Sequence, residues 1–220
     1  MTNYPCLVLD HDDTVVQSTP TIHYPAFMQT LKLLRPEVSW SLEEFTLYNF
    51  EPGFEAMCHQ LLGFTEQEMK QQEAGWRSYA AVHQPPMFPG MAQIIQRQRA
   101  EGGLVCVVSH SQADIIARDY QAHCGFVPDM IFGWELGAEK RKPNPWPLRQ
   151  ILERTGFAPG QLLMVDDLKP GLAMARSCEV PFAFAGWGCS LVPIRQQMET
   201  QADHCFTRVQ ELEALLFGGK

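Results

Sequence analysis

The 220-residue chain lacks a long apolar segment and a paired arrangement of cysteines. No apolar run approaches the roughly 18 residues of a membrane-spanning helix, and the first residues lack the basic stretch of a secretory signal peptide. The seven cysteines are odd in number and no two have Cys-x-x-Cys spacing, which argues against a disulfide framework and a zinc site. These absences predict a cytoplasmic protein that does not bind a membrane.

Positive charge is also scarce, with 17 Lys and Arg residues against 25 Asp and Glu residues and a formal net charge of −8. Such a chain repels polyanions at long range, so we expect no nucleic-acid partner. Small anionic substrates are compatible with this charge, because a few fixed cations and a metal ion can reverse the local sign. A hydrophobic content of 45% is typical of a packed globular protein rather than a disordered one.

Short apolar runs that end in polar residues alternate with helix-like segments along most of the chain. Runs without polar alternation are typical of strands that are buried on both faces of a parallel sheet. The pattern therefore predicts the α/β class, with a doubly wound, mostly parallel sheet. The expected strands are 6–9, 104–108, 130–132, 162–165 and 181–184, and the expected helices are 90–100, 111–123, 145–155 and 168–178.

One long region breaks this alternation, because it shows helical periodicity and no convincing strand. Ser41 with Glu44, and Thr65 with Glu68, have the spacing of capping boxes. A proline-rich stretch then ends the region. We expect an all-helical insert over 17–87 in an α/β core of 1–16 and 88–220. Its expected helices are 22–34, 42–50, 54–62 and 66–82.

Clusters of acids follow two of the predicted strands, at the sheet edge where open α/β sheets bind ligands. Asp10, Asp12 and Asp13 follow the first strand, and Asp166 and Asp167 follow the fourth. Carboxylates at this density repel one another unless a cation is bound or one of them stays protonated. A solvated turn is the alternative for the first cluster, whereas two acids directly after a buried strand favour a metal site.

Two further polar clusters contain a hydroxyl and a cation. Ser109 ends a predicted strand, where its hydroxyl and nearby backbone N–H groups can bind a phosphate oxygen. In the alternative, Ser109 or Ser111 caps the following helix. Lys142 precedes Pro143 at a predicted helix start, which would hold a cation in place beside anionic groups. Lysines in such surroundings are otherwise commonly just solvated.

In this order the four clusters resemble the motifs of the haloacid dehalogenase superfamily, and the resemblance covers nearly the whole chain. Asp10-x-Asp12-x-Thr14 follows an apolar strand, and Ser109, Lys142-Pro143 and Asp166-Asp167 come after it. The helical insert is similar to the C1-type cap of the phosphoglycolate phosphatase and β-phosphoglucomutase branch. The resemblance implies a Rossmann-like core with an inserted cap domain.

The resemblance also implies a phosphatase that acts on a small phosphorylated metabolite. Asp10 would be the nucleophile that forms an aspartyl phosphate, and Asp12 would act as general acid and then as general base. Mg²⁺ would be bound by Asp10, the Asp12 carbonyl group and Asp167, with Asp166 either direct or through water. The implied phosphate-binding groups are Ser109, the backbone N–H of His110, and Lys142.

Some departures from the family pattern leave alternatives open. Asp13 stands where Gly is usual, although Asp tolerates a left-handed turn, and Gln17 and Gly171 replace acids that are common in relatives. A β-phosphoglucomutase-like phosphomutase would share the core residues, but the 49–53 loop has no Lys or Arg for a second phosphate. A non-catalytic regulator is a further alternative, but these acids argue against it, because unpaired acids lower the stability of a protein that does not use them. The sequence decides neither the substrate nor the choice between monomer and homodimer.

Overall fold

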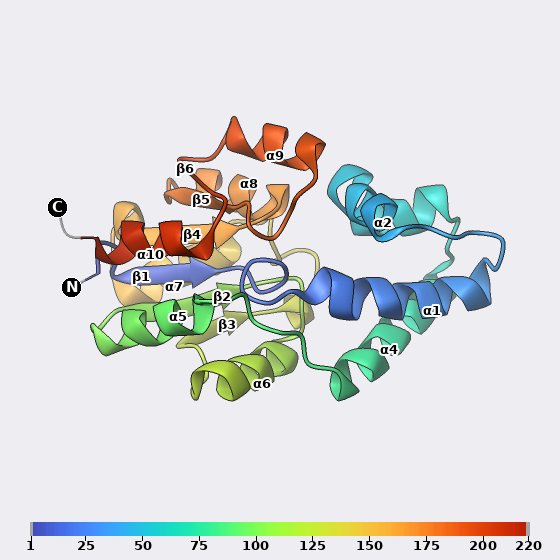
Figure 1. Ribbon diagram of the computed structural model, residues 1–220, viewed down its shortest axis with the longest axis horizontal. Coiled ribbons are helices and arrows are strands. Elements are labelled where there is room, and N and C mark those ends of the chain that lie inside the picture. Colours follow the sequence, from blue (N-terminus) through green and yellow to red (C-terminus); the bar gives the residue numbers. More distant parts are fainter. Residues whose placement is uncertain (1, 219–220) are drawn as a thin grey trace. The chain divides into compact units, whose positions relative to one another are not determined.

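A six-stranded parallel sheet is the centre of the larger of two compact units in the computed structural model, which describes residues 2–218 (Figure 1). The strand order is β3-β2-β1-β4-β5-β6, so the direction of winding reverses between β1 and β4. The predicted α/β class with a doubly wound parallel sheet is confirmed. The strands are β1 (Cys6–Leu9), β2 (Leu104–Val108), β3 (Met130–Phe132), β4 (Leu162–Asp166), β5 (Phe182–Ala185) and β6 (His204–Phe206).

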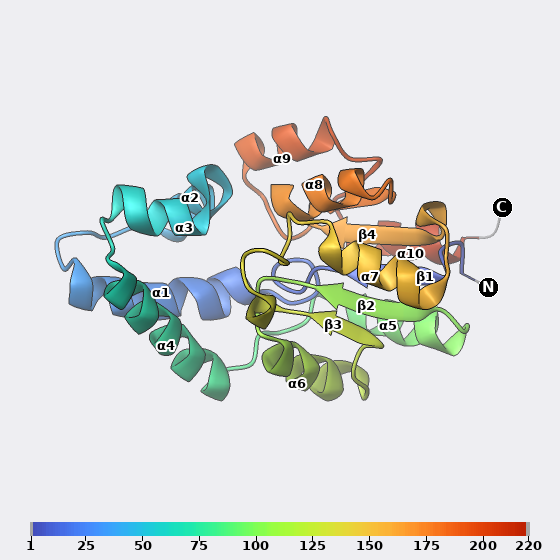
Figure 2. The same cartoon turned by 180° about the vertical axis from the view of Figure 1, so that it is seen from behind.

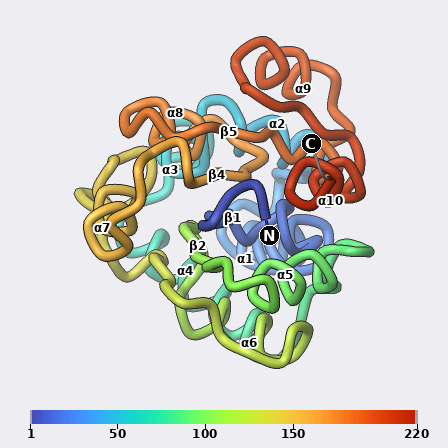
Figure 3. Tube along the Cα trace, turned by 90° about the vertical axis from the view of Figure 1, so that its left-hand side faces the viewer, coloured from blue at the N-terminus to red at the C-terminus, as the bar shows by residue number. Residues whose placement is uncertain are grey.

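Helices cover both faces of this sheet, as the opposite views of Figures 1 and 2 and the end view of Figure 3 show. One face packs against α5, α6 and α10 through a cluster of buried apolar side chains, among them Ile95, Ile116 and Leu212. The helices α7 and α8 lie on the opposite face. The helices of this unit are α5 (Met91–Ala100), α6 (Ala113–Cys124), α7 (Trp146–Thr155), α8 (Lys169–Ser177), α9 (Val192–Glu199) and α10 (Val209–Phe217).

The second compact unit is Gln17–Pro86, and the first unit comprises the residues up to Val16 and from Met87 onward. Both predicted capping boxes are present, at the starts of α2 and α4. Phe27, Phe45 and Met57 are buried in the core of this unit. Its role as a cap over a substrate stays a prediction. Its α-helices are α1 (Tyr24–Leu34), α2 (Leu42–Tyr48), α3 (Phe54–Ala56) and α4 (Glu66–Val82).

Two elements of the second unit differ from the helices expected over 42–50 and 54–62. The helix α2 ends at Tyr48, and a wide turn over Asn49–Gly53 follows it. In this turn Glu51 has non-helical backbone angles and Gly53 has a φ of 100°. Pro52 cannot donate an intrahelical hydrogen bond, and the positive φ of Gly53 is unfavourable for other residues. The second region is α3 followed by the π-helical turn Met57–Leu61.

Cysteine chemistry in the described chain is that of free thiols. All seven cysteines are unpaired with respect to disulfides, and six of them are buried. The Sγ atoms of Cys6 and Cys106 lie 3.8 Å apart, within the distance of a thiol hydrogen bond. Over residues 2–218, no helix is both long enough and apolar enough to cross a membrane.

Candidate active site

The first part of the site is the tight turn that follows β1. The His11 carbonyl oxygen accepts hydrogen bonds from the backbone N–H groups of Val15 at 2.9 Å and Val16 at 3.1 Å. Asp13 has a φ of 51°, in the left-handed region. Asp is one of the few residues besides Gly that adopts this conformation readily, so the expected tolerance at this position is confirmed. The turn gives Asp10 and Asp12 their positions at the end of β1.

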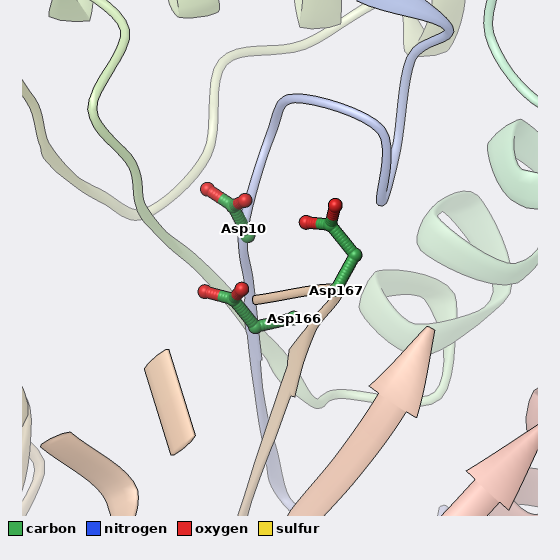
Figure 4. Close-up of side chains that lie close together, drawn as sticks. All are labelled: Asp10, Asp166 and Asp167. Carbon is green, nitrogen blue, oxygen red and sulfur yellow. The ribbon is translucent and has the colours of Figure 1, made fainter. Parts of the chain in front are cut away.

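Three carboxylates meet where β1 and β4 end. Asp10, Asp166 and Asp167 are buried, and each contributes an oxygen such that these oxygens all lie within 4.8 Å of one another (Figure 4). Asp10 and Asp166 are 156 residues apart in the sequence, but they lie close together because β1 and β4 are neighbours at the switch point of the sheet. This set of hard oxygen donors fits a divalent cation such as Mg²⁺.

Lys142 is the cation that the structure places among these acids. Its Nζ lies 2.8 Å from Asp10 Oδ1 and 2.6 Å from Asp166 Oδ2, and its side chain is almost completely buried. Burial alone would lower the pKa of Lys142, but the two carboxylates raise it above its usual value. Lys142 is therefore charged and holds both acids in place.

One lysine does not balance three acids in this buried cluster. Burial raises the pKa of Asp166 to about 7 even though Lys142 opposes the shift. Burial, followed by repulsion from Asp166 and Asp10, raises the pKa of Asp167 well above its usual value. Raised pKa values of neighbouring carboxylates mean that the cluster binds either protons or another cation. The donor set and its excess negative charge both fit a bound metal ion.

Asp12 faces the segment that follows β2. Its Oδ2 atom accepts hydrogen bonds from Ser111 Oγ at 2.6 Å and from Ser109 Oγ at 3.3 Å. Neither serine is the N-cap of α6, because that position is Gln112, which makes no side-chain capping bond. The helix-cap alternative is therefore wrong, and both hydroxyls lie beside the predicted acid–base residue. A site role for Ser111 was not predictable from the sequence motifs.

His110 is connected to Lys142 through its side chain. His110 Nε2 lies 2.7 Å from the backbone carbonyl oxygen of Lys142, to which it donates a hydrogen bond. The next residue back from the lysine, Arg141, stacks on Trp134 with its guanidinium carbon 3.4 Å from the ring centroid. These contacts fix the backbone around Lys142. The role predicted for His110 is that of its backbone N–H, and its side-chain contact with Lys142 was not predictable from the motifs.

Other contacts in the site join residues that are far apart in the sequence. Thr14 Oγ1 donates a hydrogen bond to Asp167 Oδ1 at 3.4 Å, and Trp187 Nε1 donates one to the Thr14 carbonyl oxygen at 2.9 Å. A Cβ atom at Gly171 would lie 2.1 Å from Asp166 Oδ2. Gly171 therefore leaves space for the carboxylate, and no local pattern in the sequence signals this role.

Two of three known proteins that resemble this chain do so along most of its length. Protein CbbY of Rhodobacter capsulatus is 27% identical over 184 residues, which cover 78% of this chain and 80% of that protein. Phosphoglycolate phosphatase of Rhodospirillum rubrum is 35% identical over 68 residues, covering 31% of this chain and 27% of that protein. The crystal structure of CbbY from Rhodobacter sphaeroides with xylulose-1,5-bisphosphate has a TM-score of 0.75 at 18% identity, and covers 95% of this chain and 96% of that one.

The family comparison agrees with the arrangement of the site. The haloacid dehalogenase-like hydrolases match residues 4–179, a range that includes the turn after β1, the serines after β2, Lys142 and the paired acids after β4. The resemblance inferred from the sequence motifs is confirmed, and this chain belongs to the haloacid dehalogenase-like hydrolase family.

Proposed function

We propose that this protein is a Mg²⁺-dependent phosphatase that hydrolyses a small phosphomonoester through an aspartyl-phosphate intermediate on Asp10. The observation that carries the proposal is the meeting of Asp10, Lys142 and the paired acids Asp166 and Asp167, with Asp12 on the same turn as Asp10. A second acid on that turn supports phosphoryl transfer, because the reaction needs a proton donor besides the nucleophile. The name of one relative, phosphoglycolate phosphatase, agrees with it.

The first half of the reaction forms a bond between an Asp10 carboxylate oxygen and phosphorus. The bond between phosphorus and the substrate oxygen breaks, and Asp12 donates a proton to the departing alcohol. In the second half, Asp12 takes a proton from a water molecule whose oxygen attacks phosphorus, and the Asp10–phosphorus bond breaks. Contacts of Asp12 with Ser109 and Ser111 would hold its carboxyl group in position for both transfers.

Charge on the transferring phosphoryl group needs fixed donors and cations. Lys142 would bind phosphate oxygens, together with the Ser109 hydroxyl and the His110 backbone N–H. The Asp10 and Asp167 carboxylates and the Asp12 carbonyl oxygen would hold Mg²⁺. When bound, the ion would neutralise charge shared by the phosphate and the carboxylates. The two Asp166 oxygens accept hydrogen bonds from Lys142 and from the Leu168 backbone N–H, which favours contact of Asp166 with the ion through water.

The relatives guide the choice of substrates to test. One is named a phosphoglycolate phosphatase, and the CbbY of Rhodobacter sphaeroides was crystallised with xylulose-1,5-bisphosphate. We propose that the substrate belongs to the same chemical class of small phosphorylated acids and sugars. The assay measures inorganic phosphate released from phosphoglycolate, pentose and hexose phosphates, xylulose-1,5-bisphosphate and nucleotides, with product analysis to detect isomerised sugar phosphates.

The matched control for this screen is Asp10→Asn, since an amide is not a competent nucleophile. We expect this variant to lose at least ~10³-fold in kcat on the best substrate while it remains folded. Activity within tenfold of wild type would rule out Asp10 as the nucleophile. A wild-type enzyme that releases no phosphate from any member of the panel in the presence of Mg²⁺ would refute the phosphatase proposal.

A further inference from the structure

A buried polar pair lies behind the turn that carries Asp10 and Asp12. The ring of His11, which stands between these two acids, is 1% exposed, and its Nε2 lies 3.2 Å from Asp119 Oδ2. Asp119 is a residue of α6 and is completely buried. The pair therefore connects the turn after β1 with the helix after β2, across 108 residues of sequence.

The second oxygen of Asp119 is occupied by a cation. Arg118 lies 2.9 Å from Asp119 Oδ1 through Nε and 2.8 Å through Nη2. The carboxyl oxygens of Asp119 accept both contacts, so His11 Nε2 carries the hydrogen that is shared with Oδ2. His11 Nδ1 is also buried, and among residues 2–218 it has no hydrogen-bond partner. Asp119 is thus the polar group that fixes the orientation of the ring.

Stability alone is a weak reason for this arrangement. Placing a carboxylate and an imidazole in a core that also contains Ile116 and Tyr120 costs desolvation energy, and apolar side chains of similar volume are often as stable or more stable. Buried polar pairs of this kind are better suited to selecting one geometry, because each partner has a single favourable position. The geometry selected here is that of the turn around His11, and the residues on either side of His11 are the proposed nucleophile Asp10 and the proposed acid–base group Asp12.

His11 is also held through its backbone, since its carbonyl oxygen accepts the hydrogen bonds from Val15 and Val16 that close the turn. We propose that His11 and Asp119, with Arg118 as counter-ion, are positioning residues that set the geometry of Asp10 and Asp12 relative to the serines before α6. The kinetic consequence rests on the proposed phosphatase function. An error of about 1 Å in such a site can cost roughly 10²-fold in rate.

The decisive variant is the double substitution His11→Leu with Asp119→Leu, which removes both polar groups and leaves neither one buried alone. Arg118 is 32% exposed and can reach solvent. We expect a melting temperature close to that of wild type, a kcat at least ~20-fold lower, and a KM within about threefold. The conservative variant His11→Gln keeps an N–H donor toward Asp119 and should retain kcat within about fivefold of wild type.

Ile116→Ala is the matched control, because it alters the same helix in the same core and leaves the hydrogen bond between His11 and Asp119 in place. It should lower the melting temperature and leave kcat within about threefold of wild type. A double variant with wild-type kcat would overturn the proposal and leave the pair as packing only. Equal losses of kcat in His11→Gln and in the double variant would also overturn it, since a retained donor would then have no effect.

Amide hydrogen exchange of the peptide 10–16 tests the same proposal without turnover. The Val15 and Val16 amides, which bond to the His11 carbonyl oxygen, should exchange at least ~10-fold faster in the double variant than in wild type or in Ile116→Ala. Unchanged exchange would overturn the proposal. An inactive wild-type enzyme combined with faster exchange in the double variant would refute the phosphatase function alone, so the two failures are distinguishable.

Discussion

Substitution of Gly171 by Ala tests whether the glycine makes room for Asp166. The added Cβ would lie 2.1 Å from Asp166 Oδ2, about 1.3 Å closer than the 3.4 Å at which ordinary contacts begin. Asp166 cannot turn aside without loss, because its oxygens accept hydrogen bonds from Lys142 at 2.6 Å and from the Leu168 N–H at 2.8 Å. Either the carboxylate or the first turn of α8 must therefore move.

Two opposing effects determine the stability of this variant. Ala is favoured over Gly inside a helix by up to ~1 kcal/mol, whereas overpacking a tight site costs about 1–3 kcal/mol. We expect a net loss of up to ~2 kcal/mol in the free energy of unfolding, measured by denaturant titration. Activity should respond more strongly, with kcat falling roughly 10²-fold, because a displacement of about 1 Å carries Asp166 and Lys142 out of position.

Gly160→Ala is the matched control, since no atom lies within 4 Å of a Cβ at that position. It should change the free energy of unfolding by no more than ~0.5 kcal/mol, and it should change kcat by no more than the factor that corresponds to the same energy. The phosphate-release assay on the best substrate of the panel compares the three proteins directly. A Gly171→Ala enzyme with kcat within threefold of wild type and no loss of stability would refute the steric argument.

Three further predictions concern the acids and their cation. A chelator should abolish activity and Mg²⁺ should restore it, whereas Ca²⁺ should not, because its longer bonds and additional ligands could draw both Asp10 oxygens into coordination; full turnover in excess chelator would contradict this. Burial raises the pKa of Asp166 to about 7, so the folded protein binds this proton more tightly than the unfolded chain, whose Asp pKa is about 3.9. The stabilisation of the folded protein by this proton is complete below pH ~4 and is lost as the pH rises toward 7. Without metal, the melting temperature should therefore fall between pH ~4 and ~7, and it should fall less in Asp166→Asn. Equal dependence of the melting temperature on pH in the two proteins would contradict this prediction. Lys142→Met should reduce kcat by at least ~10²-fold, since it removes the cation beside Asp10 and Asp166; retention of a tenth of wild-type activity would contradict its role.

The sequence predicted the parts of the site that are local in the chain. Asp10, Asp12 and the paired acids after β4 were predictable because each follows an apolar strand, and parallel strands bring their carboxyl ends to one edge. The positive φ of Asp13 was predictable from the tolerance of Asp for that conformation. Local patterns of this kind also predicted both capping boxes of the helical unit.

Contacts between distant residues were not predictable in the same way. Nothing in the residues around Asp119 indicates that it accepts a hydrogen bond from His11, and nothing around Gly171 indicates the carboxylate that it accommodates. The strand β6 was not predicted, for a different reason. It has three residues of mixed exposure, which is too short for a recognisable pattern. The helices α9 and α10 were likewise not among the expected elements.

The position of β1 in the sheet has a consequence for how the protein folds during synthesis. β1 pairs on one side with β2 and on the other with β4, whose register begins at Leu162. At ~5–20 residues per second, roughly 8–30 s separate the synthesis of β1 from that of β4. During that interval an apolar strand intended for the centre of the sheet has an unpaired edge, on which other chains can pair. The strand order that brings the proposed nucleophile and the paired acids together thus also leaves the emerging chain with an unpaired strand edge until β4 has been made.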